Sequence, residues 1–267
     1  MQKNQMIHFI VATDSEARPV IDLFKLKKFL SSKVIIYNNK EISVTITGIG
    51  KLNSAIGVTQ TFYEFSKVIN SCWINLGLAG HKAYKLGKIF SVKKIQDTED
   101  MKSYYPYVSD FNIEYEECLT LGKQKKEYSS KLYDMESSGF FQAANKFSSK
   151  ELIQFIKIIS DNRLNSIDFR NKKEVYDLII GNKKKISGLC NYLKEVKEIV
   201  SIKNKEFIDK QYLDLSKKIS FTFTEEVQFK SLLNLYYSKY SSLKKNAFNK
   251  DENAKYNINK LKNILKL

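Results

Sequence analysis

Residues 6–16 read Met-Ile-His-Phe-Ile-Val-Ala-Thr-Asp-Ser-Glu, a mostly apolar run that gives way at once to polar residues. A short run with hydrophobic residues on both faces is typical of a strand buried in a parallel sheet. Asp14 or Ser15 can cap a following helix, and Pro19 is tolerated in the first turn of such a helix. The stretch therefore predicts a strand that leads into a helix, as in α/β proteins.

The same alternation of strand and helix continues outward along the chain. One helix is expected to follow the transition at 13–16 and to reach about residue 29, and another to follow the glycine turn at 47–55 and to reach about residue 67. Further helices are expected at 135–147 and at about 172–200, and further strands at 33–37, 41–47, 72–76, 88–94, 116–121 and 152–160. Short turns, several of them containing glycine, separate these elements. The pattern predicts an α/β fold with a mixed, mostly parallel central sheet that is flanked by helices.

The character of the sequence changes after Ser201. Residues 201–267 contain neither glycine nor proline, and helical segments are clearest at 225–243 and 254–267. Thr224 followed by two glutamates is a typical helix start, because acidic residues are favourable in the first turn. We therefore expect an α/β domain over residues 1–200 and a C-terminal α-helical extension over residues 201–267.

Composition narrows the class of protein. Hydrophobic residues make up 43% of the chain and aromatic residues 13%, as in a folded protein. No apolar stretch approaches the roughly 20 residues of a membrane span, and the first residues lack the features of a signal peptide. Cys72, Cys118 and Cys190 are widely separated, which favours neither a disulfide framework nor a metal site. We expect a cytoplasmic protein with no membrane association, metal or cofactor.

The net charge of +16 raises the question of nucleic-acid binding. Only Arg18, Arg163 and Arg170 among the 45 basic residues are arginines, whereas readers of bases and phosphates favour the bidentate guanidinium. Solvated lysine faces are the favoured interpretation. Association of nucleic acid with the lysine-rich tail, which has 19 lysines against 9 acids over residues 183–267, is kept as the less favoured alternative.

Four groups of residues carry the chemistry, in a fixed order along the chain. They are Ala-Thr-Asp-Ser-Glu at 12–16, Thr-Gly-Ile-Gly-Lys-Leu-Asn-Ser-Ala at 47–55, Asn-Leu-Gly-Leu-Ala-Gly at 75–80 with Leu-Gly-Lys at 86–88, and Tyr-Asp-Met-Glu-Ser at 133–137 with Ile-Ile-Ser-Asp at 158–161. Together they resemble the nucleoside phosphorylase and nucleosidase superfamily, and most of all the hydrolases that cleave methylthioadenosine and S-adenosylhomocysteine. The resemblance covers residues 6 to about 200.

The resemblance implies hydrolysis of the N-glycosidic bond of a purine-type nucleoside, with release of the free base. This reaction needs an acid for the leaving base, a group that holds the ribose hydroxyls and a base for water. By position, Asp161 is the acid, Glu136 and the Met135 backbone hold ribose, and Glu16 activates water. The resemblance also implies that substrate contacts Ile49, Ala79, Gly80, Lys157 and Ser160. It further implies a homodimer, because nucleosidases of this type are commonly dimers.

Two alternatives stay open beside the hydrolase. Phosphorolysis needs an anion site, which the related phosphorylases build with arginines; here Arg18 is the only guanidinium near the first motif, so water is the favoured nucleophile. A catalytically altered nucleoside-binding protein is the other alternative. Each carboxylate also has a purely structural explanation, since Glu16 and Asp161 can cap helices and Glu136 can stabilise a first turn.

The sequence departs from the nucleosidase pattern in three places. Leu78 stands where these enzymes have a serine, and Lys157 stands where they have an arginine near the attacking water. The loop before the Asp-Met-Glu motif is short, so the residues that hold adenine in those enzymes have no counterpart. His81 takes the place of a glycine and is a candidate cavity residue. These departures leave open which base and which 5′ substituent the substrate carries.

Overall fold

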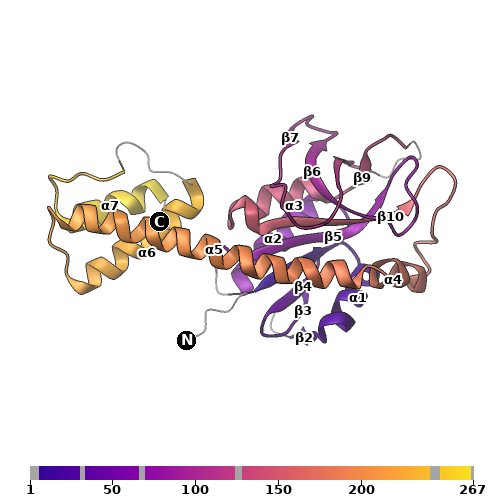
Figure 1. Ribbon diagram of the computed structural model, residues 1–267, viewed down its shortest axis with the longest axis horizontal. Helices are drawn as coiled ribbons and strands as arrows, with labels where there is room; N and C mark the ends of the chain where they lie inside the picture. The colour runs from indigo at the N-terminus through magenta and orange to yellow at the C-terminus, as the bar shows by residue number, and fades with distance from the viewer. Residues whose placement is uncertain (1–5, 31–33, 66–69, 124–127, 241–246, 266–267) are drawn as a thin grey trace. The chain divides into compact units, whose positions relative to one another are not determined.

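Figure 1 shows the computed structural model, which describes residues 6–30, 34–65, 70–123, 128–240 and 247–265. Ten strands of this part of the chain form one sheet: β1 Ile7–Val11, β2 Lys27–Phe29, β3 Ile35–Asn38, β4 Ile42–Ile46, β5 Cys72–Gly80, β6 Ile89–Asp97, β7 Ser103–Tyr104, β8 Tyr115–Thr120, β9 Leu132–Asp134 and β10 Ile153–Asp161. The α-helices are α1 Asp14–Phe24, α2 Lys51–Glu64, α3 Ser137–Ala144, α4 Lys172–Ile180, α5 Lys183–Ser216, α6 Phe223–Tyr240 and α7 Ala254–Leu265, and Lys150–Leu152 form a 3-10 turn. The predicted ends at residues 33, 67, 243 and 267 lie outside the described residues.

The sheet is mixed, as predicted. Its strand order is β10-β6-β8-β9-β5-β1-β4-β3-β2, with β7 on β6 and a further pairing between β10 and β5. The parallel pairs are β1–β4, β1–β5, β5–β10, β6–β8 and β8–β9. The central strands β1, β5 and β10 are buried along almost their whole length, which explains their continuous apolar runs.

The parallel pairings decide where the four motifs meet. Strands β1, β4, β5 and β10 run in the same direction, so their carboxyl ends lie at one edge of the sheet. The motifs follow or end these strands: Thr13–Glu16 after β1, Gly48–Gly50 after β4, Gly80 at the end of β5 and Asp161 at the end of β10. Strand β9 joins the same edge through one pairing of Tyr133 with Gly80. Such an edge is the usual place for a ligand site in α/β proteins.

Two pairs of helices pack against the sheet. Helix α2 packs on α3 and contacts β1 and β4, while α1 packs on α4 and contacts β1, β4 and β5 (Figure 1). Gly48 and Gly50, which lead into α2, have φ angles of 87° and 107°, a region that glycine adopts without strain. The chain can therefore turn sharply from β4 into α2 at the motif edge of the sheet.

Three predicted helices differ from the structure, and the helix predicted over 135–147 is the shorter α3, Ser137–Ala144. The helix predicted to reach residue 29 ends at Phe24, because Lys25 adopts a left-handed conformation, and β2 then pairs with β3. The helix predicted over 172–200 is two helices, α4 and α5, which are separated at Gly181 and Asn182. Helix α5 continues to Ser216, across the predicted domain boundary at residue 200.

The chain divides into two compact units, Met1–Lys194 and Glu195–Leu267. The first contains the sheet and its core. The second is helical, and its own core is formed by apolar side chains that include Phe229, Leu233, Tyr236 and Leu261. None of the described helices is long and apolar enough to span a bilayer.

Candidate active site

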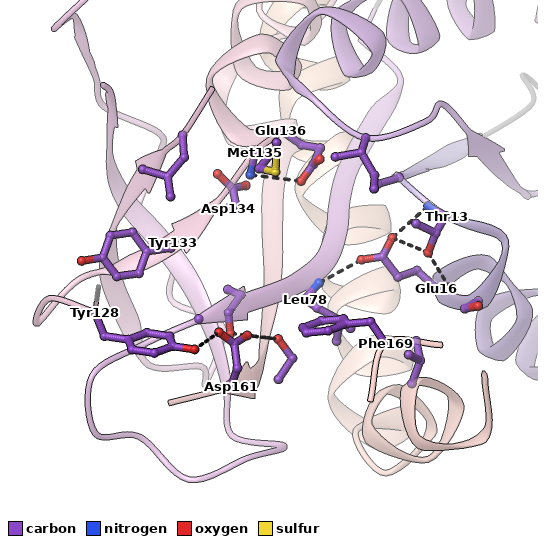
Figure 2. Close-up of a pocket in the computed structure, with 18 residues that line it drawn as sticks. Thr13, Glu16, Leu78, Tyr128, Tyr133, Asp134, Met135, Glu136, Asp161 and Phe169 are labelled. Carbon is purple, nitrogen blue, oxygen red and sulfur yellow. Dashed lines mark hydrogen bonds between the residues drawn. The ribbon is translucent and has the colours of Figure 1, made fainter. Parts of the chain in front are cut away.

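A cavity of about 390 Å³ opens at the carboxyl ends of the central parallel strands, within the size range of small-molecule sites (Figure 2). Its wall comes from every one of the four motifs and from the segments beside them. The lining residues are Ala12, Thr13, Ser15, Glu16, Ile49, Leu78, Ala79, Gly80, Leu121, Tyr128, Tyr133, Asp134, Met135, Glu136, Ser160, Asp161, Phe169 and Val175.

Glu16 is fixed in the wall by the start of helix α1. Its side chain completes a capping box: Oε2 accepts hydrogen bonds from the Thr13 N–H at 2.9 Å and the Thr13 hydroxyl at 3.0 Å. Oε1 accepts a hydrogen bond of 3.0 Å from the Leu78 N–H on strand β5. The N-cap of α1 is therefore Thr13, and not Asp14 or Ser15 as predicted, and Glu16 both completes the capping box and lines the cavity.

Glu136 lies between strand β9 and helix α3, where its carboxylate meets the turn before α2. Oε1 accepts a 2.9 Å hydrogen bond from the Gly50 N–H, and Oε2 accepts one of 3.3 Å from the Met135 N–H. Burial raises the pKa of Glu136 from 4.5 to about 7, and the negative charge of Asp134 acts in the same direction. The carboxylate thus titrates close to neutral pH.

Asp161 ends strand β10 with hydroxyl donors on both of its oxygens. Ser160 donates to Oδ1 at 2.6 Å, and Tyr128 donates to Oδ2 at 2.7 Å (Figure 2). Short O–H···O⁻ hydrogen bonds of this kind are among the stronger ones in proteins. They fix the carboxyl group at the wall of the cavity.

Lys157 does not line the cavity, although the resemblance predicts that it contacts substrate. Its ammonium is fully buried, 2.6 Å from Asp134 Oδ2 and 2.6 Å from Asn75 Oδ1. A Cβ on Gly77 would lie 3.6 Å from this ammonium and 3.4 Å from Glu16 Oε1, so glycine leaves space between the two groups. The lysine therefore lies behind the wall and near it.

Lys157 and Asp134 form a buried ion pair beside the part of the cavity wall that contains Glu136. Burial opposes both charges, but the Lys157 charge lowers the pKa of Asp134, and the Asp134 charge raises the pKa of Lys157. Asp134 also accepts hydrogen bonds from the hydroxyls of Thr120 and Ser137 and from the Ser137 N–H. Each member of the pair thus has hydrogen-bond partners besides the other, which a buried ion pair needs to persist.

The structure brings eight of the nine predicted site residues to one cavity. Glu16 and Asp161 line it together with the predicted substrate-binding residues Ile49, Ala79, Gly80, Met135, Glu136 and Ser160. His81 lies outside the wall: its ring stacks on Tyr84, and Nδ1 accepts hydrogen bonds from the Ala83 and Tyr84 N–H groups. Arg18 forms an exposed ion pair with Asp22.

Sequence reasoning missed three aromatic lining residues, Tyr128, Tyr133 and Phe169. Tyr133 stood inside a recognised motif without an assigned role. Tyr128 and Phe169 belong to irregular segments that carry no periodic signal, so only the fold could place them. Among the lining residues the charged side chains are all acidic, without a lysine or arginine. In the described part of the chain, no group of three or more His, Cys, Asp or Glu side chains is placed to hold a metal ion.

The sequence matches no protein-family model and no curated protein. Among solved structures, the chain is similar to 5′-methylthioadenosine nucleosidase of Arabidopsis thaliana, with 14% identity, a TM-score of 0.58, and 72% of this chain and 97% of that chain covered. An MTA/SAH nucleosidase matches with 12% identity, a TM-score of 0.60 and coverage of 72% and 97%. A futalosine hydrolase mutant of Helicobacter pylori strain 26695 matches with 14% identity, a TM-score of 0.55 and coverage of 70% and 99%. The chain therefore has the fold of the nucleoside phosphorylase and nucleosidase superfamily.

Proposed function

We propose that this protein hydrolyses the N-glycosidic bond of a purine-type nucleoside, of the kind represented by methylthioadenosine or S-adenosylhomocysteine, and releases the free base. One observation carries the proposal: Glu16, Glu136 and Asp161, which come from three separate segments, line a single cavity. The solved structures with the same fold include nucleosidases named for these substrates. The three carboxylates match the three demands of the chemistry.

Asp161 acts on the leaving base. As the bond between C1′ and N9 breaks, its electron pair moves into the purine, and Asp161 donates a proton to N7. The departing base is then neutral and the aspartate is ionised. Ser160 and Tyr128 both donate hydrogen bonds to this carboxyl group, so they stabilise the charge that the transfer leaves behind.

Glu136 holds the sugar. The carboxylate accepts hydrogen bonds from the ribose hydroxyls, while the Gly50 N–H keeps its orientation from the opposite side. Negative charge beside the ring also stabilises the sugar cation that forms as the base leaves. Ionised Asp134, two residues before Glu136, adds to this field.

Glu16 positions the nucleophile. A water molecule attacks C1′ of the sugar cation and transfers a proton to the carboxylate of Glu16. Thr13 and Leu78 hold this carboxylate from two sides, so the orientation of Glu16 is set before substrate binds. The products are the free purine base and the free sugar. Asp161 and Glu16 return to their starting states when Glu16 releases its proton to solvent and Asp161 takes one up.

The charge of the cavity wall favours water over phosphate and a nucleoside over a nucleotide. None of the three arginines lines the cavity, and Lys157, which lies behind its wall, is paired with Asp134. Bringing a phosphate beside Glu16, Glu136 and Asp161 would place like charges together without a compensating cation. Lys157 serves instead to keep Asp134 ionised and in place.

The test is a panel of purine ribonucleosides incubated with and without inorganic phosphate, with release of base and sugar followed by chromatography. We expect base release without phosphate, and free sugar as the other product. Asp161→Asn should lower the rate by about 10²–10⁴-fold, the usual contribution of a general acid, while nucleoside binding persists. Asp22→Asn, which removes an exposed carboxylate on α1, is the matched control and should keep full activity.

The outcomes separate the alternatives. Formation of sugar phosphate only when phosphate is added would identify a phosphorylase. Binding of nucleosides by the wild type with no release of base would identify a nucleoside-binding protein. Unchanged base release by Asp161→Asn would remove Asp161 from the role of acid.

A further inference from the structure

The short segment before the Asp-Met-Glu motif brings a tyrosine to the proposed acid. The Tyr128 hydroxyl lies 2.7 Å from Asp161 Oδ2, and its ring makes an edge contact with Tyr133, 6.4 Å between centroids (Figure 2). The next residue anchors the segment: the Ser129 carbonyl accepts a 3.0 Å hydrogen bond from the Lys82 N–H. Tyr128 is thus held in the cavity wall beside the group that meets the base.

Gly80 makes the approach of these two side chains possible. A Cβ at this position would lie 2.8 Å from Asp161 Oδ2 and 3.1 Å from Tyr128 Cε1. Both contacts are closer than ordinary van der Waals distance, so any other residue would push the tyrosine and the carboxyl group apart. Glycine at the end of strand β5 therefore leaves the space in which Tyr128 and Asp161 meet.

The direction of the hydrogen bond decides what Tyr128 can offer to a ligand. Burial raises the pKa of Tyr128 to about 12, and the hydrogen bond to Asp161 acts in the same sense, so the phenol keeps its proton at neutral pH. The single proton points to Asp161. The phenol oxygen therefore presents only lone pairs to the cavity.

Proton transfer to the base does not change this arrangement. When Asp161 has given up its proton it is a carboxylate, which can only accept, and Tyr128 and Ser160 are its donors. The tyrosine proton therefore stays committed to Asp161 Oδ2 in the state that catalysis produces. The substituent of the purine next to N7 therefore faces a hydrogen-bond acceptor, the oxygen of Tyr128.

We infer that Tyr128 determines base specificity: its oxygen accepts a hydrogen bond from the exocyclic amino group beside N7, so the site takes 6-aminopurine nucleosides and rejects 6-oxopurine nucleosides. The edge of adenine that carries N7 presents an N6 amino donor, whereas guanine and hypoxanthine present the acceptor O6 there. An O6 atom would face the Tyr128 oxygen with no proton between them. A buried acceptor without a donor costs binding energy, and this cost is the source of the discrimination.

This inference rests on the proposed function, because it assumes that Asp161 meets N7. The test compares adenosine with inosine, and the free bases adenine with hypoxanthine, on the full-length wild type, on Tyr128→Phe and on Tyr84→Phe. Tyr84 is the matched control: its hydroxyl also donates to a carboxylate, Glu116, at 3.1 Å, but it lies outside the cavity wall. Turnover is measured as kcat/KM, and base binding by calorimetry.

The wild type should prefer adenosine over inosine by about 100-fold or more in kcat/KM, and should bind adenine more tightly than hypoxanthine. Tyr128→Phe should reduce both preferences by about tenfold, the effect of one hydrogen bond, and Tyr84→Phe should leave both unchanged. A ratio that Tyr128→Phe does not move, or a wild-type preference for the 6-oxo compounds, overturns the inference. Absence of turnover with every nucleoside counts against the proposed function alone, since the binding ratio of the free bases still tests Tyr128.

Discussion

At the scale of single residues, the three carboxylates that we propose to act on substrate are each oriented by a different set of hydrogen-bond donors. Glu16 is held by the backbone and hydroxyl of Thr13 and by a strand N–H, Glu136 by two backbone N–H groups, and Asp161 by two hydroxyls. A backbone N–H has a fixed direction, whereas the O–H bond of a hydroxyl group can rotate. Asp161, the proposed proton donor to the purine, is thus the one of the three that is held by hydroxyl groups alone.

Glu136 gives stability a pH dependence that can be measured. Its pKa rises from 4.5 to about 7 because burial and the charge of Asp134 disfavour the ionised form. Between these two values the folded state holds a proton that the unfolded state has released, so this group makes the protein less stable as pH rises through that window. Glu136→Gln removes the ionisation.

We therefore expect Glu136→Gln to gain stability relative to the wild type as pH rises from 5 to 8, by on the order of 1 kcal/mol. Urea unfolding at the two pH values measures this difference, and Asp22→Asn on the exposed face of α1 is the control. The same variant should lose nucleoside affinity, because the amide cannot accept from the ribose as a carboxylate does. Equal stability differences at pH 5 and pH 8 would contradict the assignment of this titration to Glu136.

At the scale of elements, helices α2 and α3 set the distance between Glu136 and the turn at Gly50 that holds its carboxylate. A Cβ on Gly139 of α3 would lie only 1.8 Å from the backbone oxygen of Lys51, the first residue of α2. The obstacle is backbone, which cannot rotate away. The two helices can cross this closely only with glycine at that position.

Gly139→Ala should separate the two helices and destabilise the protein by about 1–3 kcal/mol, the usual cost of overpacking. Activity should fall as well, since Glu136 and Gly50 lie at the starts of these helices and are joined by a hydrogen bond. Gly188→Ala in α5 is the control, because there a Cβ meets only the ring of Phe111 at 3.3 Å. Thermal unfolding and base release report the two effects, and equal melting temperatures for Gly139→Ala and the wild type would refute the close crossing.

The strands and the motif edge could be predicted from the sequence because each depends on local signals. Buried runs such as residues 6–12 indicate strands of a parallel sheet, and parallel strands bring their carboxyl ends together. The pairing of Lys157 with Asp134 could not be predicted in this way, since the two residues are 23 positions apart on different strands. Likewise, one left-handed residue, Lys25, ended a helix that propensity would have continued.

At the scale of the whole molecule, the chain carries a charge of +16, yet the charged side chains that line its cavity are all acidic. The excess of lysine therefore lies away from the proposed chemistry. Net charge alone would have pointed to a polyanion as ligand, whereas the cavity favours a neutral or cationic one. Long-range attraction of anions to the surface and selection within the cavity are separate properties of this protein.

The sequence resemblance predicts a homodimer, and we propose an exposed apolar stripe on helix α2 as its interface. Leu52, Ile56 and Tyr63 of α2 are 70%, 45% and 56% exposed, and Ile49, just before the helix, is 57% exposed and also lines the cavity. Their spacing places them along one stripe of the helix. A second copy that covers this stripe would bury apolar surface beside the cavity mouth.

We predict that the full-length protein is dimeric at micromolar concentration and that the double variant Leu52→Lys, Ile56→Lys is monomeric. Burial of a leucine or isoleucine contributes about 1.5–3 kcal/mol, and a two-fold interface contains each of them twice, so dissociation should increase by more than about 100-fold. Leu30→Lys, at an 86% exposed leucine outside α2, should leave the dimer intact. Light scattering coupled to gel filtration measures the mass. A wild-type monomer, or a dimer that persists in the double variant, would exclude this stripe as the interface. If the double variant loses both the dimer and catalysis, the partner subunit helps to complete the cavity beside Ile49.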